Sequence, residues 1–197
     1  RYFLKYAAES NLKKVILELG GKSPAIVMDD VDDLQPIVEQ LAIGILFSQG
    51  ENCSAGSRLL VHEKVKGRLL EALVEHFKTW TVGDPLVEGT RIGALIDEKH
   101  MNNILGYIKA GVEEGGRIIL GGQRIRQETG GYYIEPTIFD DVSNQMTIAR
   151  EEIFGPVLSV ISFSSVEEAI AIANDTPYGL AASLYTNNLH TCLLYTS

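Results

Sequence analysis

A cysteine stands among small and polar residues in the sequence FSQGENCSAGSR, residues 47–58. Cys53 has the residue types that a nucleophile needs around it, because a reactive cysteine must be partly exposed and positive potential favours its thiolate. Its neighbours Ser54, Ala55 and Gly56 would let a substrate carbon reach the sulfur and would leave backbone N–H groups free to bind an oxyanion. The alternative is an inert loop cysteine, since free cysteine often behaves as a small hydrophobe.

A carboxylate stands in the sequence LELGGKSP, residues 17–24, directly before two glycines. Glu18 lies in an otherwise apolar run. An apolar setting raises the pKa of a carboxyl group and lets it act as a general base near neutral pH. The alternative is a strand acid that pairs with Lys22 or another nearby lysine.

A third polar stretch, EEIFGPV, covers residues 151–157. A carboxylate here could accept hydrogen bonds from sugar hydroxyls, and Phe154 could pack on a flat ring. The alternative is a capped turn that leads into a strand.

The elements that must position these residues follow from hydrophobic periodicity and turn signals. We predict strands at residues 14–19, 24–28, 57–63, 117–120, 132–142, 155–163 and 180–186, and helices at 1–10, 34–49, 64–80, 97–115 and 165–176. Asp32 or Asp33 can cap the second helix, with Pro36 in its first turn. A capping box from Ser165 to Glu168 opens the last helix. Residues 123–131 read as a loop or hairpin tip.

This alternation is typical of an α/β fold with a mostly parallel sheet and helices on both faces. The three chemical stretches adjoin glycine-rich turns after strands or helices, where open α/β sheets bind ligands. The final segment TCLLYTS, residues 191–197, follows no clear period and does not favour a helix.

Composition excludes several classes of function. The net charge is −9 and the isoelectric point about 4.9, which argues against a nucleic-acid partner. No apolar run approaches the roughly 18–20 residues of a membrane span. The four histidines fall at no metal-ligand spacing, so we expect no metal site. Two cysteines in 197 residues fit a reducing compartment, so we expect a cytoplasmic protein.

Together, LELGGKSP, FSQGENCSAGSR and EEIFGPV closely resemble the aldehyde dehydrogenase family in their order, and the separation of Glu18 from Cys53 fits that family. The stretch NDTPYGLAASLYTNN, residues 174–188, is also similar to it. The resemblance covers residues 1–190. It implies that Cys53 attacks an aldehyde to form a thiohemiacetal, that its backbone N–H helps to hold the oxyanion, and that Glu18 activates the water that hydrolyses the later thioester.

The resemblance also implies that NAD or NADP is the cofactor. It implies that Glu152 binds the nicotinamide ribose and that Phe154 lies against the nicotinamide. Leu19 and Gly20 would lie close to the nicotinamide end of the cofactor. Asn52 and Ser54 flank the nucleophile and would line the path of a small polar aldehyde. Within the family, the sequence is most similar to the branch that oxidises amino-aldehydes, such as betaine aldehyde or γ-glutamyl-aminobutyraldehyde.

In the family's arrangement, residues 1–19 would be the C-terminal end of a cofactor-binding domain, 20–190 the catalytic domain, and 191–197 an atypical tail. The resemblance implies a chain truncated at both ends, without the turn that meets the cofactor pyrophosphate, so that it binds NAD weakly and has little activity alone. The full-length protein would be a homo-oligomer. Three alternatives remain: a CoA-acylating relative, against which Glu18 argues, a cysteine-dependent esterase, and an inactive fragment.

Overall fold

The computed structural model describes residues 1–196, with side chains described through Leu193. A six-stranded sheet in the order β3-β6-β7-β2-β1-β8 forms its centre. Strand β3 pairs antiparallel with β6, and the other neighbours pair in parallel. The strands are β1 (Pro24–Val27), β2 (Arg58–His62), β3 (Arg117–Leu120), β6 (Thr137–Asp140), β7 (Val157–Phe163) and β8 (Ser183–Tyr185). The predicted mostly parallel sheet is confirmed.

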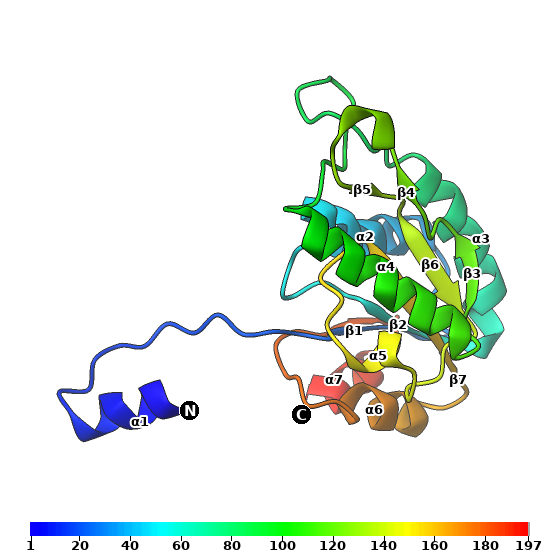
Figure 1. Cartoon of the computed structure of the whole chain (residues 1–197). Helices are drawn as coiled ribbons and strands as arrows, with labels where there is room; N and C mark the ends of the chain where they lie inside the picture. Colours follow the sequence, from blue (N-terminus) through cyan, green and yellow to red (C-terminus); the bar gives the residue numbers. More distant parts are fainter. Residues whose placement is uncertain (197) are drawn as a thin grey trace.

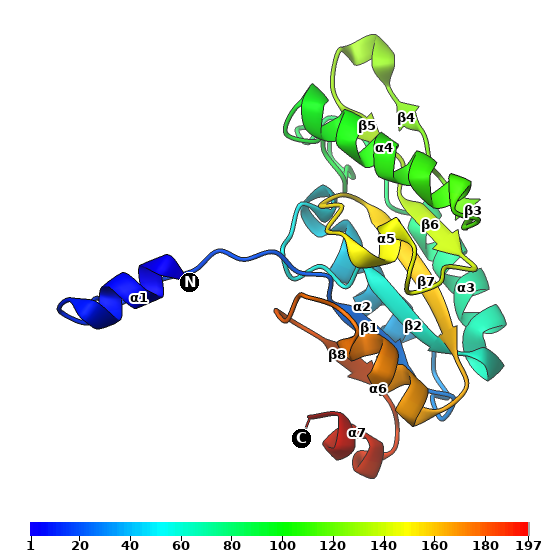
Figure 2. The same cartoon turned by 60° about the horizontal axis from the view of Figure 1, so that its bottom comes forward.

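Helices cover both faces of this sheet (Figures 1 and 2). One core packs α2 (Gln35–Leu46) and α3 (Glu63–Lys78) on one face, and a second packs α4 (Glu98–Glu113), α5 (Thr147–Arg150) and α6 (Val166–Asn174) on the other. Along β2, Leu59 and Val61 belong to the first core and Leu60 to the second. Strands buried on both faces lose the polar alternation of half-exposed strands, which explains their continuous apolar runs.

The turn residues behave largely as predicted. The predicted loop or hairpin tip at residues 123–131 belongs to a hairpin of β4 (Arg124–Ile125) and β5 (Tyr133–Ile134), with the short 3₁₀ turn η2 (Gln127–Thr129) at its tip. The Ser165 side chain caps α6 by accepting from Glu168 N at 3.2 Å. The Glu168 carboxylate, however, reaches back to Ser164 N at 2.8 Å, one residue earlier than in the usual capping box.

The N-terminus of α2 differs from the prediction. Pro36 lies in its first turn as expected, but Leu34 rather than an aspartate occupies the N-cap. The Asp33 carboxylate still accepts from Gln35 N at 3.0 Å from one position upstream. It therefore satisfies one free N–H at the helix start without taking the cap position itself.

The strand predicted at residues 14–19 is absent. After helix α1 (Tyr2–Glu9), the chain runs without secondary structure to β1 and extends away from the folded body (Figures 1 and 2). Ile16 is 79% exposed and Leu19 57% exposed. A strand needs a neighbour to accept and donate its backbone hydrogen bonds, and no strand within residues 1–196 pairs with this segment.

The last residues also differ from the prediction, because α7 (Leu189–Thr196) is a helix. Asn188 provides the local cause: its side-chain oxygen accepts from His190 N at 2.8 Å and Thr191 N at 3.2 Å, which is N-cap geometry. Ser197 lies outside the described residues. Across the part of the chain that the structure covers, every helix is too short or too polar to cross a membrane.

Candidate active site

The chemical stretches identified in the sequence meet at one edge of the sheet. Residues 20–23 precede β1, 47–57 precede β2, 151–156 precede β7, and 174–182 precede β8. Because these strands are parallel, the four loops gather at their amino ends. Three of the loops follow helices as expected, but the one after Glu18 follows no strand. Open parallel sheets usually bind ligands at the opposite, carboxyl edge, so this location departs from the general expectation.

Close backbone contacts between glycines hold these loops together. A Cβ on Gly21 would overlap the Cys53 carbonyl oxygen, and a Cβ on Gly50 would overlap the backbone of Gly155. Gly50 also has a φ of +76°, a conformation that glycine adopts without steric cost. Gly21 and Gly50 therefore let these loops touch backbone to backbone, Gly21 against Cys53 and Gly50 against Gly155.

Glu152 connects two of these loops through its carboxylate. Its Oε1 accepts from Gly21 N at 2.9 Å. Its Oε2 lies against Gly20, where a Cβ would overlap the oxygen, and accepts no hydrogen bond from any residue of the described chain. One carboxylate oxygen is therefore fixed while the other is available, and this fits a group that accepts from sugar hydroxyls. The predicted cofactor residues Gly20 and Glu152 do come together.

Leu19 and Phe154 lie at the same edge with exposed side chains. Leu19 and Gly20 line a cavity of about 280 Å³ together with residues 177–180. Phe154 and Glu152 line a small cavity beside Asn52 and Gly21. The flat ring of Phe154 is 38% exposed, so it is available to contact a ligand.

The loop around the nucleophile candidate is shaped by its neighbours. Cys53 is partly exposed and forms no disulfide. Asn52 Oδ1 accepts from Ser54 N at 3.2 Å and from Ser54 Oγ at 3.1 Å, as in an Asx turn. Within residues 1–196 no acceptor takes the Cys53 N–H. The loop thus presents a thiol with an available backbone donor beside it.

Glu18 is not brought into this cluster. It is exposed on the extended segment between exposed Leu17 and Leu19, so the apolar setting expected from the sequence is absent. It makes no hydrogen bond or ion pair within the described part of the chain. The alternative pairing with Lys22 is also wrong, since Lys22 is only 1% exposed and its Nζ has no hydrogen-bond partner among residues 1–196.

Burial changes the acid–base properties of two groups near the site. The pKa of Lys22 falls to about 7, chiefly because burial disfavours its charge and secondly because Arg58 is near, while Glu152 and Glu151 oppose the shift. The pKa of Tyr107 rises to about 12 through burial and through its 2.8 Å hydrogen bond to Glu151.

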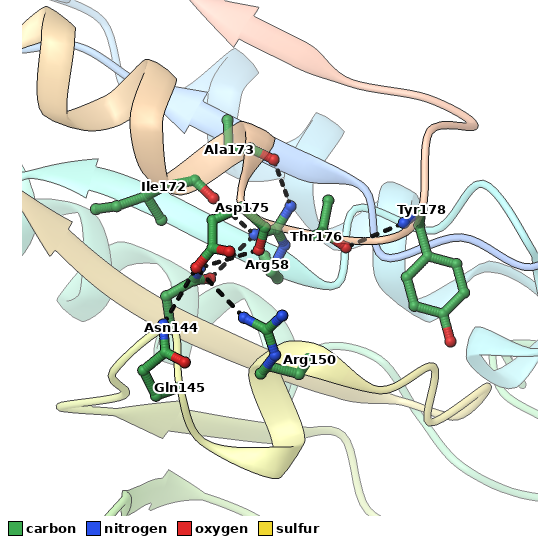
Figure 3. A network of polar contacts seen from close by, with 9 residues as sticks. All are labelled: Arg58, Asn144, Gln145, Arg150, Ile172, Ala173, Asp175, Thr176 and Tyr178. Atoms are coloured by element: carbon green, nitrogen blue, oxygen red, sulfur yellow. Dashed lines mark hydrogen bonds and ion pairs between the residues drawn. The ribbon is translucent and has the colours of Figure 1, made fainter.

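Sequence reasoning gave no role to Arg58, the first residue of β2, which lies within a network of polar contacts (Figure 3). It is 0% exposed. Its Nε donates to Lys22 O at 2.9 Å, Nη2 to Ala173 O at 2.9 Å, and Nη1 to Ile172 O and Asn144 Oδ1, both at 3.0 Å. Two of these acceptors are last-turn carbonyls of α6, where a cation is favourable. Arg58 thereby joins the start of β2 to the loop before β1 and to α6.

Asp175 extends this network to α5 (Figure 3). Its Oδ2 accepts from Asn144 at 3.0 Å and Gln145 at 3.1 Å, and pairs with Arg150 at 3.3 Å. The Asn144 hydrogen bond and the Arg150 charge hold the pKa of Asp175 below its usual value. Since α5 leads directly into the loop of Glu152, the network ties the 174–182 loop to it.

His100 is a second residue that sequence reasoning missed. From the first turn of α4, its Nε2 donates to Phe154 O at 2.7 Å and lies 3.6 Å from Glu51 Oε1. Glu51 also accepts from Ile96 N at 3.1 Å. These partners are far apart in sequence, so no local pattern could have paired them. No group of three or more potential metal ligands occurs among the residues that the structure covers.

Comparison with known proteins defines the class. The aldehyde dehydrogenase family profile matches residues 1–197. The chain therefore belongs to the aldehyde dehydrogenase family, a family of oxidoreductases.

Individual relatives are similar over nearly all of this chain. It is 48% identical over 193 residues to aminoacetaldehyde dehydrogenase of Pseudomonas aeruginosa, covering 98% of this chain and 38% of that protein. A mutant indole-3-acetaldehyde dehydrogenase from P. syringae, solved with NAD+, superimposes with a TM-score of 0.92 at 54% identity, covering 99% of this chain and 39% of that one.

A further solved structure, γ-glutamyl-γ-aminobutyraldehyde dehydrogenase from Burkholderia cenocepacia, gives a TM-score of 0.91 at 49% identity, over 99% of this chain and 39% of that one. The chain spans about two-fifths of the length of these relatives.

Proposed function

We propose that this chain carries the catalytic portion of an enzyme that oxidises a small aldehyde to a carboxylic acid with NAD or NADP. The observation that carries this proposal is the meeting of Gly21, Cys53 and Glu152 at one sheet edge. The loop of the Cys53 thiol and the Glu152 carboxylate, which can accept hydrogen bonds from sugar hydroxyls, both contact the Gly20–Gly21 turn. Such an arrangement suits a reaction in which a covalently held substrate meets a nucleotide cofactor.

Cys53 is proposed as the nucleophile. Its thiolate forms a C–S bond with the aldehyde carbon, and the carbonyl oxygen becomes an oxyanion that the unclaimed Cys53 N–H stabilises. Glu18 then takes a proton from the water that hydrolyses the thioester and releases the acid and the thiolate. Because Glu18 is exposed on the extended segment, this step depends on that segment folding toward Cys53.

Glu152, Phe154, Leu19 and Gly20 are proposed to hold the nicotinamide end of the cofactor. The fit rests on the available Oε2 of Glu152 and on the missing Cβ at Gly20. When bound, NAD or NADP supplies the acceptor for the hydride that leaves the thiohemiacetal carbon. The complex of the P. syringae relative with NAD+ supports NAD as the cofactor.

The wider properties of the protein are proposals of the same kind. Residues 1–19 would belong to a cofactor-binding domain of a longer, cytoplasmic and homo-oligomeric protein, with residues 20–190 in its catalytic domain. Amino-aldehydes are the proposed substrates, with Asn52 and Ser54 lining their path. The names of the P. aeruginosa and B. cenocepacia relatives support this class.

The test is a Cys53→Ala variant of the full-length protein that contains this chain. Aldehyde-dependent reduction of NAD should fall to background, because no other group in the mechanism can form the thioester. Cys192→Ala is the matched control and should retain activity, since Cys192 lies on α7, outside the four loops of the site. Turnover that survives in Cys53→Ala would remove the nucleophile assignment.

A further inference from the structure

His100 lies between the loop of the nucleophile and the loop of the cofactor carboxylate. Its Nε2–H donates to the Phe154 carbonyl at 2.7 Å, and Glu51 Oε1 stands 3.6 Å from the same nitrogen. The His100 and Phe154 rings also meet edge to face, with centroids 6.0 Å apart. A single side chain from α4 therefore contacts both loops, and α4 belongs to neither.

Both loops adopt backbone conformations that need outside support. Phe154 has a φ of +58°, and Ser48 and Gln49 have φ values of +52° and +60°. Non-glycine residues adopt this left-handed conformation at a cost, and it persists where surrounding contacts hold it. The His100 bond holds the carbonyl of Phe154 itself. Gln49 is held in a similar way, because its Oε1 accepts from Gly93 N at 3.2 Å.

We propose that His100 is a positioning residue that holds the Cys53 loop and the Glu152–Phe154 loop in one arrangement. Its role in turnover rests on the function proposed above, but the contacts themselves do not. The side chain works through Glu51 and Phe154 rather than on the substrate. Both contacts are partly shielded, since the side chains of His100 and Glu51 are 19% and 14% exposed.

His62 offers a matched control at the opposite edge of the sheet. Its Nε2 lies 3.1 Å from the Ser164 carbonyl and 3.8 Å from Asp29 Oδ2, and its ring meets Phe163 edge to face. These three contacts are of the same kinds as those of His100, and His62 Nδ1 also accepts from Lys64 N at 3.3 Å. None of these residues adjoins Cys53. Loss of His62 should therefore reproduce any general loss of stability without altering the Cys53 loop.

The experiment measures how fast iodoacetamide alkylates Cys53 relative to Cys192 in the 197-residue chain, by mass spectrometry of the two peptides. In His100→Ala we expect the ratio to rise about fivefold, in line with the loss of one net hydrogen bond. His100→Gln can still donate to the Phe154 carbonyl and should return the ratio to within about twofold of the original. His62→Ala should leave the ratio unchanged.

An unchanged ratio in folded His100→Ala, or an equal rise in His62→Ala, would overturn the proposal. Should His100→Ala fail to fold, Glu51→Ala removes the other side of the contact and should also raise the ratio. An unchanged ratio in that variant would likewise count against the proposal. Because alkylation needs neither cofactor nor aldehyde, this outcome is independent of the oxidation test on Cys53→Ala.

Discussion

Replacing Arg58 by methionine should destabilise the chain more than any other single change of a polar residue around the site. Methionine fills a similar volume but donates no hydrogen bond, so four acceptors lose their donor. Two of them, Lys22 O and Ala173 O, are bonded in buried surroundings, and the other two are partly buried. A stranded buried acceptor costs about 1–3 kcal/mol, and partly buried ones cost less because water replaces the donor.

These contributions add to about 4 kcal/mol after allowance for the desolvation of the guanidinium that methionine avoids. That is a large share of the roughly 5–15 kcal/mol that separates folded from unfolded domains. The assay is urea denaturation followed by circular dichroism. With an m-value of about 2 kcal/mol/M, the midpoint should fall by about 2 M.

Two further variants keep this prediction open to refutation. Arg58→Lys retains the charge but cannot reach four acceptors in a planar fork, so its loss should be intermediate. Arg117→Met is the control: the Arg117 side chain is 59% exposed, and of its two partners Asp141 is exposed while the buried Asp140 keeps its pair with Lys66 at 2.7 Å, so its loss should be small. If Arg58→Met shifted the midpoint no more than Arg117→Met, the reasoning from buried acceptors would be wrong.

Two other changes test the close packing and the buried charge of the site. Gly21→Ala in the full-length protein should lower kcat/KM at least about 100-fold, because its Cβ overlaps the Cys53 carbonyl and misplacement by about 1 Å costs that much; Gly44→Ala, with nothing near its Cβ, is the control and should be silent. For Lys22, whose folded pKa of about 7 lies below 10.5, the unfolded chain binds more protons between these values, so wild-type stability should rise with pH relative to Lys22→Met by about 1.4 kcal/mol per unit. Denaturant titrations at pH 7, 8 and 9 measure this, and a flat difference would contradict the shifted pKa.

Much of the fold could be predicted from sequence because its signals are local. The parallel strands appear as apolar runs since both faces are buried, and α4 and α6 begin at residues whose side chains cap them. The strand predicted at residues 14–19 is absent for a physical reason. An apolar run indicates a tendency to be buried, but within residues 1–196 no strand pairs with this one. The helix α7 has only a weak hydrophobic period, and its start is fixed by the side chain of Asn188, which periodicity does not report.

The candidate site divides in the same way. Cys53 was predicted from the residue types around it, and Glu152 and Gly20 from the resemblance to the family; the structure brings the loops of these residues together. Arg58 and His100 were missed, because their partners are separated from them by 36 to 115 residues in one case and by about 50 in the other. An arginine between a loop and a strand has no local pattern that distinguishes a buried anchor from a surface charge. The roles of Arg58 and His100 depend on how α6 and α4 pack against the loops, which the local sequence does not indicate.

The position of the site at the amino ends of the strands explains why it depends on such anchors. At a carboxyl edge, ligands commonly meet helix N-termini that follow the strands and present free N–H groups. Here three of the four loops instead leave a helix C-terminus and enter a strand, so these helix ends present carbonyls and partial negative charge. Arg58 offsets that charge at the end of α6, and the backbone N–H groups of Gly21 and Cys53 are donors that lie within the loops themselves. Gly21 therefore has two roles in the site: its N–H donates to Glu152, and its missing Cβ allows the close contact with Cys53.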